Sequence, residues 1–141
     1  MKLRFDASGR LPPGIHWVTW RDVAAAFGFT PRRVRLLAGL REALGLLKRA
    51  GCRLVYIDGS FVTAKAEPQD FDACWGIAGV DLDRLDPVFL DFSYSRARQK
   101  ARFLGELFPA ELPEGITGRT FLEFFQTDKE TAPGKASWAW I

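Results

Sequence analysis

Residues 59–72, G-S-F-V-T-A-K-A-E-P-Q-D-F-D, are the most informative stretch of this sequence. A strand is predicted on each side of it, and Asp70 and Asp72 would then share one side of the second strand, because residues two apart in a strand face the same way. Two carboxylates this close repel each other, and a hard divalent cation is the usual partner of such a pair. Gly59 and Ser60, after the first strand, let a bare backbone and a hydroxyl approach phosphate oxygens.

Neither half of this pattern is specific by itself. Asp81-Leu82-Asp83 repeats the D-x-D spacing without a Gly-Ser partner, and D-x-D alone is typical of solvated acids at a strand end or a turn. A much rarer combination is a strand followed by Gly-Ser, nine further residues, D-x-D and a second strand. The combination therefore carries the functional hypothesis.

The flanking sequence predicts an α+β fold, a small mixed β-sheet with covering helices and an N-terminal helical pair. Apolar periodicity and capping residues predict helices over 20–27, 31–50 and 95–108. Runs of β-branched and aromatic residues predict strands over 53–57, 71–75, 120–126 and 137–141. We expect a single domain over 1–141, with the arm and helical pair in 1–50 and the sheet core in 51–141.

Composition narrows the functional classes. The chain has 141 residues, 48% hydrophobic and 26% charged, which is typical of one globular domain. No apolar run approaches the roughly 20 residues that cross a bilayer, and the N-terminus does not resemble a secretory signal. Cys52 and Cys74 are too few for a disulfide framework or a four-cysteine zinc site. We therefore expect a cytoplasmic protein with reduced thiols and no membrane partner.

The segment 59–72 resembles the signature of the nucleotidyltransferase superfamily, the polymerase-beta-like fold, in which Gly-Ser and Asp-x-Asp lie on the first two core strands. The wider chain is similar to a small bacterial and prophage-associated branch of that superfamily. The stretches that carry this wider similarity are 11–16, 56–63, 86–92 and 121–128. The resemblance implies a sheet of nucleotidyltransferase type.

The resemblance also implies a reaction, the Mg²⁺-dependent transfer of a nucleoside monophosphate from an NTP to a protein or RNA acceptor. Asp70, Asp72 and a third acid from a later core strand would hold Mg²⁺, or Mn²⁺ in its place. Glu123 is the best match for the third acid, because it is the only acid in the apolar run 120–126, and Asp91 is the second candidate. The hypothesis requires these acids to converge beside the Gly-Ser turn.

Three further residues would contact the phosphates on this hypothesis. Gly59 and Ser60 would hold the β- and γ-phosphates, and Lys65 would neutralise phosphate charge as a mobile cation. The chain departs from many small members in having Phe61-Val62-Thr63 where an arginine or glycine soon follows Gly-Ser. Because of this departure, the resemblance does not determine which residues contact the triphosphate.

Residues 20–50 allow a different interpretation, a DNA-binding helix-turn-helix. The matching positions are Ala24, Gly28 and Val34, and the arginines of the second helix are Arg32, Arg33 and Arg35. DNA is nevertheless not the expected partner, because the second helix is longer than most recognition helices and its apolar stripe continues to Ala50.

A third interpretation is a catalytically decayed transferase that binds a protein, since small members of the superfamily often resemble antitoxins that act on a partner toxin. The basic helix over 95–108 fits both the transferase and the DNA-binding interpretation. Trp138 and Trp140 lie on one face of the last predicted strand, a pattern that fits either the core or a homodimer surface.

Overall fold

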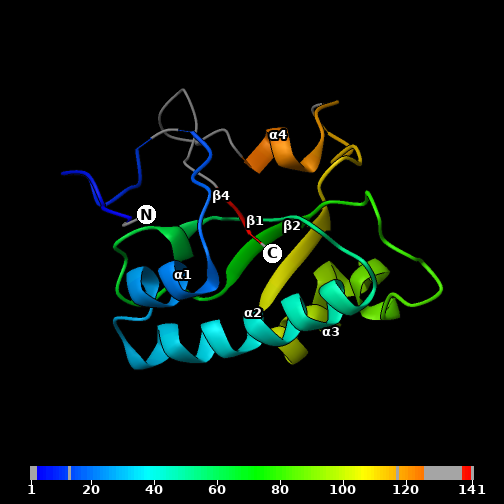
Figure 1. Cartoon of the computed structure of the whole chain (residues 1–141), viewed down its shortest axis with the longest axis horizontal. Coiled ribbons are helices and arrows are strands. Elements are labelled where there is room, and N and C mark those ends of the chain that lie inside the picture. The colour runs from blue at the N-terminus through cyan, green and yellow to red at the C-terminus, as the bar shows by residue number, and fades with distance from the viewer. Residues whose placement is uncertain (1–2, 13, 117, 126–137, 141) are drawn as a thin grey trace.

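The computed structural model describes residues 3–12, 14–116, 118–125 and 138–140, and Figure 1 shows how the elements are arranged. The helices are α1 (Trp20–Phe27), α2 (Pro31–Arg49), α3 (Ser93–Phe103) and α4 (Phe121–Phe125), and two 3₁₀ turns are η1 (Ser60–Val62) and η2 (Pro87–Leu90). The strands are β1 (Val55–Asp58), β2 (Phe71–Trp75), β3 (Gly105–Pro109) and β4 (Trp138–Trp140).

The four strands form one mixed sheet in the order β3-β2-β1-β4. β1 runs antiparallel to both β2 and β4, and β2 runs parallel to β3. A parallel pair needs a long crossover connection, and here α3 lies in the segment that joins β2 to β3. The α+β class and the small mixed sheet predicted from the sequence are confirmed.

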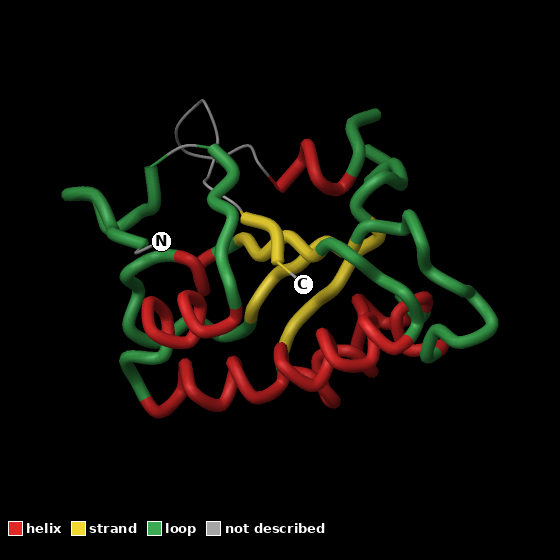
Figure 2. The backbone as a smooth tube through the Cα atoms, viewed as in Figure 1, coloured by secondary structure: helices red, strands yellow, loops and turns green. Residues whose placement is uncertain are grey.

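The two faces of the sheet differ in chemistry, because successive side chains of a strand alternate between them. One face packs against α1, α2 and α3 through a core that includes Ile57, Phe71 and Leu107. In Figure 2 these three helices lie on one side of the strands and α4 lies on the other. α4 covers only part of the second face, where Phe121 and Leu122 pack around Phe108.

The helical pair begins at the capping residues that the sequence predicts. The Thr19 hydroxyl accepts from the backbone N–H of Asp22 at the start of α1, and the Thr30 hydroxyl accepts from that of Arg33 at the start of α2. α2 then lies close to the end of α3. A Cβ on Gly39 would overlap the carbonyl oxygen of Phe103, so the approach requires glycine there.

Two predicted elements are wrong. Residues 120–126 were expected to form a strand, but Phe121–Phe125 is the helix α4. The Glu123 carboxylate accepts from the backbone and hydroxyl of Thr120, and the Thr120 hydroxyl accepts from the Glu123 backbone N–H. This is a capping box, T-x-x-E, which stabilises a helix start and was visible in the sequence.

The predicted helix over 95–108 is also too long. α3 ends at Phe103, Leu104 adopts a left-handed conformation with φ of 64°, and the strand β3 begins at Gly105. A Cβ on Gly105 would overlap the ring of Phe71 in the neighbouring strand, so close strand packing requires glycine here. The sequence interpretation missed β3 because the apolar residues of 104–108 also fit a helical stripe.

Candidate active site

Three carboxylates lie in a row across the sheet face that is opposite the helical core. Asp58 of β1 is paired with Asp72 of β2, and Asp72 is paired with Glu106 of β3. Neighbouring strands are about 4.8 Å apart, so these side chains are close neighbours on one face. We call Asp58, Asp72 and Glu106 the acid row. Asp70 is the residue before β2, two positions before Asp72, so the alternation along an extended chain predicts the same side for it.

The Gly59-Ser60 turn lies directly against this row. Gly59 has φ 81° and ψ −167°, a conformation that is essentially restricted to glycine. A Cβ on Gly59 would overlap Oδ2 of Asp72 and lie 3.2 Å from its Cγ. The structure therefore brings together the turn and the D-x-D motif, which nine residues separate in sequence.

Arg33 organises the loop that follows the turn. Its side chain is fully buried, and its guanidinium donates to the carbonyl oxygens of Phe27, Phe61, Thr63 and Lys65. Burial lowers the pKa of Arg33 to about 10, so it remains a cation at neutral pH. The carbonyl of Lys65 is therefore held in place, whereas the Lys65 residue is exposed.

The helix-turn-helix interpretation requires Arg33 at the surface of the second helix, but Arg33 is buried. Arg32 is also engaged within the chain, because its guanidinium donates to the backbone carbonyls of Pro68 and Gln69. Of the three arginines proposed for DNA reading, only Arg35 is exposed. The arrangement removes the main support for the helix-turn-helix alternative.

Two cations of α3 hold Glu106. Arg96 Nε lies 3.1 Å from Oε2, and Lys100 Nζ lies 2.9 Å from Oε1. The pKa of Asp70 is raised by burial and by the charge of Glu106, while Lys100 and Arg32 act in the opposite direction. Asp70 and Glu106 thus interact, and Lys100 acts on both of them.

Glu106 is the acid that the sequence analysis missed. It was assigned to the helix 95–108, yet it is the single acid in the apolar run G-E-L-F-P, the same signal that selected Glu123. Assigning β3 as a strand would have placed it beside Asp72. Arg96 and Lys100 were noted only as part of a basic helix.

Glu123 and Asp91 do not occupy the third position. Glu123 is exposed on α4, and the hydrogen bonds from Thr120 lower the pKa of its carboxyl. Asp91 follows η2, where the backbone N–H of Ser93 donates to it and lowers its pKa, and Arg98 lies 3.4 Å away. Within the described ranges, no three His, Cys, Asp or Glu side chains converge closely enough to hold a metal ion by themselves.

The two cysteines are free and buried. Burial raises the pKa of the Cys74 thiol well above its ordinary value, and the charges of Asp58, Asp72 and Glu111 raise it further. Burial also raises the pKa of Cys52. A thiol with a raised pKa is a poor nucleophile, so the acids rather than Cys74 are the chemically relevant groups of this face.

Asp70→Asn is expected to stabilise the fold at neutral pH. A raised pKa means that ionised Asp70 destabilises the folded state. This effect is fully present above the folded-state pKa, declines as the pH falls from there, and is gone below the ordinary pKa of the unfolded chain. The variant should therefore melt at a higher temperature at pH 7 and lose its advantage near pH 3. Thermal denaturation across this range measures the difference, and exposed Asp81→Asn is the control. A lower melting temperature for Asp70→Asn at pH 7 would contradict the expectation.

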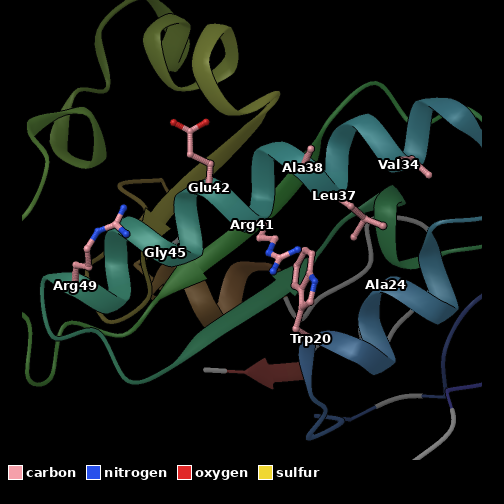
Figure 3. A pocket seen from close by; sticks show the side chains of 9 residues that line it. All are labelled: Trp20, Ala24, Val34, Leu37, Ala38, Arg41, Glu42, Gly45 and Arg49. Carbon is pink, nitrogen blue, oxygen red and sulfur yellow. The ribbon is translucent and has the colours of Figure 1, made fainter.

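A separate groove of about 560 Å³ lies on the helical layer (Figure 3). Its lining residues come from α1 and α2 and are Trp20, Ala24, Val34, Leu37, Ala38, Arg41, Glu42, Gly45 and Arg49. None of them belongs to the acid row or to the Gly59-Ser60 turn. The groove and the acids are therefore two distinct features.

These features define an α+β protein whose sheet carries a carboxylate-lined face next to a glycine turn. The chain belongs to a family of unknown function (DUF6932), which matches residues 3–137. No curated protein and no solved structure matches the chain. Within the part of the chain that the structure describes, no helix combines the length and the apolar character that spanning a bilayer requires.

Proposed function

We propose that this protein is a nucleotidyltransferase of the polymerase-beta-like type, which transfers a nucleoside monophosphate from an NTP to a protein or RNA acceptor. The contact between Gly59 and the Asp72 carboxylate carries the proposal. It joins a turn suited to phosphate oxygens with carboxylates suited to a divalent cation, on the first two strands, as in the superfamily that the sequence resembles. Glu106 replaces Glu123 in the proposed third position, because it lies next to Asp72 on β3.

The carboxylates of this face fit Mg²⁺. Mg²⁺ usually takes one or two protein carboxylates, and the substrate phosphates and water complete its shell, so a cage of three protein ligands is not required. Asp70 and Asp72 are the proposed ligands. A side chain at position 59 would overlap the Asp72 carboxylate, and glycine keeps this space open. When bound, the ion neutralises phosphate charge and lowers the pKa of an acceptor hydroxyl.

The chain's own residues then have separate tasks. Gly59 allows the backbone to approach the triphosphate, and Arg33 holds the following loop so that the turn keeps its shape. Asp70 and Asp72 present their oxygens on one side of β2. Glu106 adds negative charge at the next strand, where Arg96 and Lys100 balance it.

Binding of NTP tests the proposal. Wild type should bind at least one of the four NTPs only when Mg²⁺ is present, and Asp70→Asn plus Asp72→Asn should weaken this binding by about 100-fold or more, because the charged ligands are lost. Asp81→Asn plus Asp83→Asn removes the same charge from the D-x-D that lacks a Gly-Ser partner and should leave binding unchanged. Titration calorimetry measures both, and no Mg²⁺-dependent binding of any NTP by wild type would overturn the proposal.

Transfer is measured separately from binding. Incubation of wild type with each labelled NTP, Mg²⁺ and cell extract should yield a labelled protein or RNA band that the double aspartate variant does not produce. Mg²⁺-dependent NTP binding without any labelled product would favour the non-catalytic alternative, a decayed transferase that binds a protein partner.

A further inference from the structure

We propose that Arg96 and Lys100 are the triphosphate-binding residues of this site, and that Glu106 holds them in place until an NTP takes over their charges. The inference rests on the proposed function and extends it, because it assigns phosphate-binding cations that lie outside the Gly59-Ser60 loop. Lys65, the cation expected for this role, belongs to the exposed part of that loop.

The position of the two side chains supports this assignment. The Glu106 side chain is 15% exposed, and both cations reach it from α3. The Arg96 guanidinium also lies over the Phe108 ring, 4.9 Å from its centroid, which holds it against the sheet. Lys100 also acts electrostatically on Asp70, where its charge opposes the rise in the pKa of that carboxyl.

The other cations around α3 are engaged elsewhere. Arg98 is 82% exposed and pairs with Asp91, and Arg102 bonds to Asp86 and Glu42. Arg32 acts electrostatically on Asp70, but its donors bind backbone carbonyls. Among the described residues of α3, Arg96 and Lys100 are therefore the cations that contact the acid row.

Charge balance gives the reason for an exchange. Asp58, Asp72 and Glu106 lie on three neighbouring strands, and a divalent ion held by Asp70 and Asp72 would add positive charge beside Glu106. With that ion in place, the charge of Glu106 is compensated without Arg96 and Lys100, and a triphosphate offers these two cations several anionic oxygens. A guanidinium binds phosphate with paired hydrogen bonds and an ammonium binds it as a point charge, so both side chains suit this ligand.

If Arg96 and Lys100 move from Glu106 to the triphosphate, one variant should change two affinities in opposite directions. Arg96→Met plus Lys100→Met should weaken binding of the Mg²⁺–NTP complex by about 10- to 100-fold, because two charge-assisted contacts are lost. The same variant should bind Mg²⁺ alone several-fold more tightly, because Glu106 is then free of its cations. Calorimetric titrations with MgCl₂, with the NTP that wild type binds, and with inorganic tripolyphosphate measure these affinities.

Two further variants test whether these affinity changes are specific to the cations that contact Glu106. Arg98→Met removes a cation from the same helix without touching Glu106 and should change neither affinity. Lys100→Met alone should show both changes at smaller size, and it serves if the double variant does not fold, as judged by thermal denaturation.

The outcomes separate the two proposals. If wild type binds the NTP with Mg²⁺ and the Arg96 and Lys100 variants bind it equally well, or if both affinities change in the same direction, this inference is wrong and the proposed function stands. If tripolyphosphate binding depends on Arg96 and Lys100 but not on Asp70 and Asp72, the phosphate site stands and the proposed function is wrong. If wild type binds neither ligand, both are wrong.

Discussion

Arg33→Met is expected to lower the free energy of unfolding by about 3–5 kcal/mol, a large part of the stability of a domain this size. The guanidinium donates to carbonyls of Phe27, Phe61, Thr63 and Lys65, at distances that include 2.7 Å to Phe61 and 2.6 Å to Lys65. Methionine fills similar volume but donates nothing, so carbonyls in a buried region lose their partners. Urea denaturation of both proteins measures the loss.

The loss of the Arg33 guanidinium should also weaken ligand binding at the candidate site. The loop over 61–65 follows the Gly59-Ser60 turn directly. Without the guanidinium it keeps the local bonds to Gly59 and Ser60 and the bond from the Ala64 N–H to the Gly9 carbonyl, but three of its carbonyls lose their charged donor. Mg²⁺-dependent NTP binding should therefore weaken even under conditions where the variant remains folded. Arg35→Met is the matched control, because Arg35 is exposed on the same helix, and it should change stability by less than about 0.5 kcal/mol. Equal stability of Arg33→Met and wild type would contradict the role assigned to Arg33.

Gly59→Ala is expected to cost about 3 kcal/mol of stability and most of the affinity for Mg²⁺–NTP. Part of the cost is backbone strain, since φ of 81° with ψ of −167° is unfavourable for any residue with a Cβ. The rest is steric, because the new methyl group would overlap Oδ2 of Asp72 and displace the proposed ligand. Denaturation and calorimetry measure the two effects separately.

Gly115→Ala is the control for the strain alone. Gly115 has φ of 97°, but a Cβ there would meet no atom within 4 Å. It should lose about 1 kcal/mol and keep the affinity for Mg²⁺–NTP. If Gly59→Ala were no more destabilising than Gly115→Ala, and NTP binding were unchanged, the turn would not touch the Asp72 carboxylate in the way the structure describes.

Local sequence signals were sufficient for several elements of this fold. Thr19 and Thr30-Pro31 mark the starts of α1 and α2, and the strand 71–75 was predicted with the bounds that the structure shows. These signals act over a few residues, through capping hydrogen bonds and side-chain periodicity, so a single sequence contains them. The capping box at Thr120 and Glu123 was equally local, and the strand prediction there overlooked it.

The third acid could not be assigned in the same way. Glu106 joins Asp72 only because β3 pairs in parallel with β2 across the segment that contains α3, and nothing within 104–109 specifies that partner. The charge of Arg33 predicts a solvent-facing residue, although its spacing to Leu37 and Leu40 is that of the buried stripe of α2. The loop after β1 folds over Arg33 and supplies carbonyl acceptors that compensate for burial.

The sequence by itself determined the class of the fold, the helical pair and the presence of a glycine turn and paired aspartates around two strands. Each of these depends on interactions between residues near one another in the chain. Only the tertiary structure decided that the turn lies against Asp72, that Glu106 completes the acid row, and that Arg33 is internal. Strand register and loop packing bring together residues that are distant in sequence, and the contacts that specify them exist only once the whole sheet has formed.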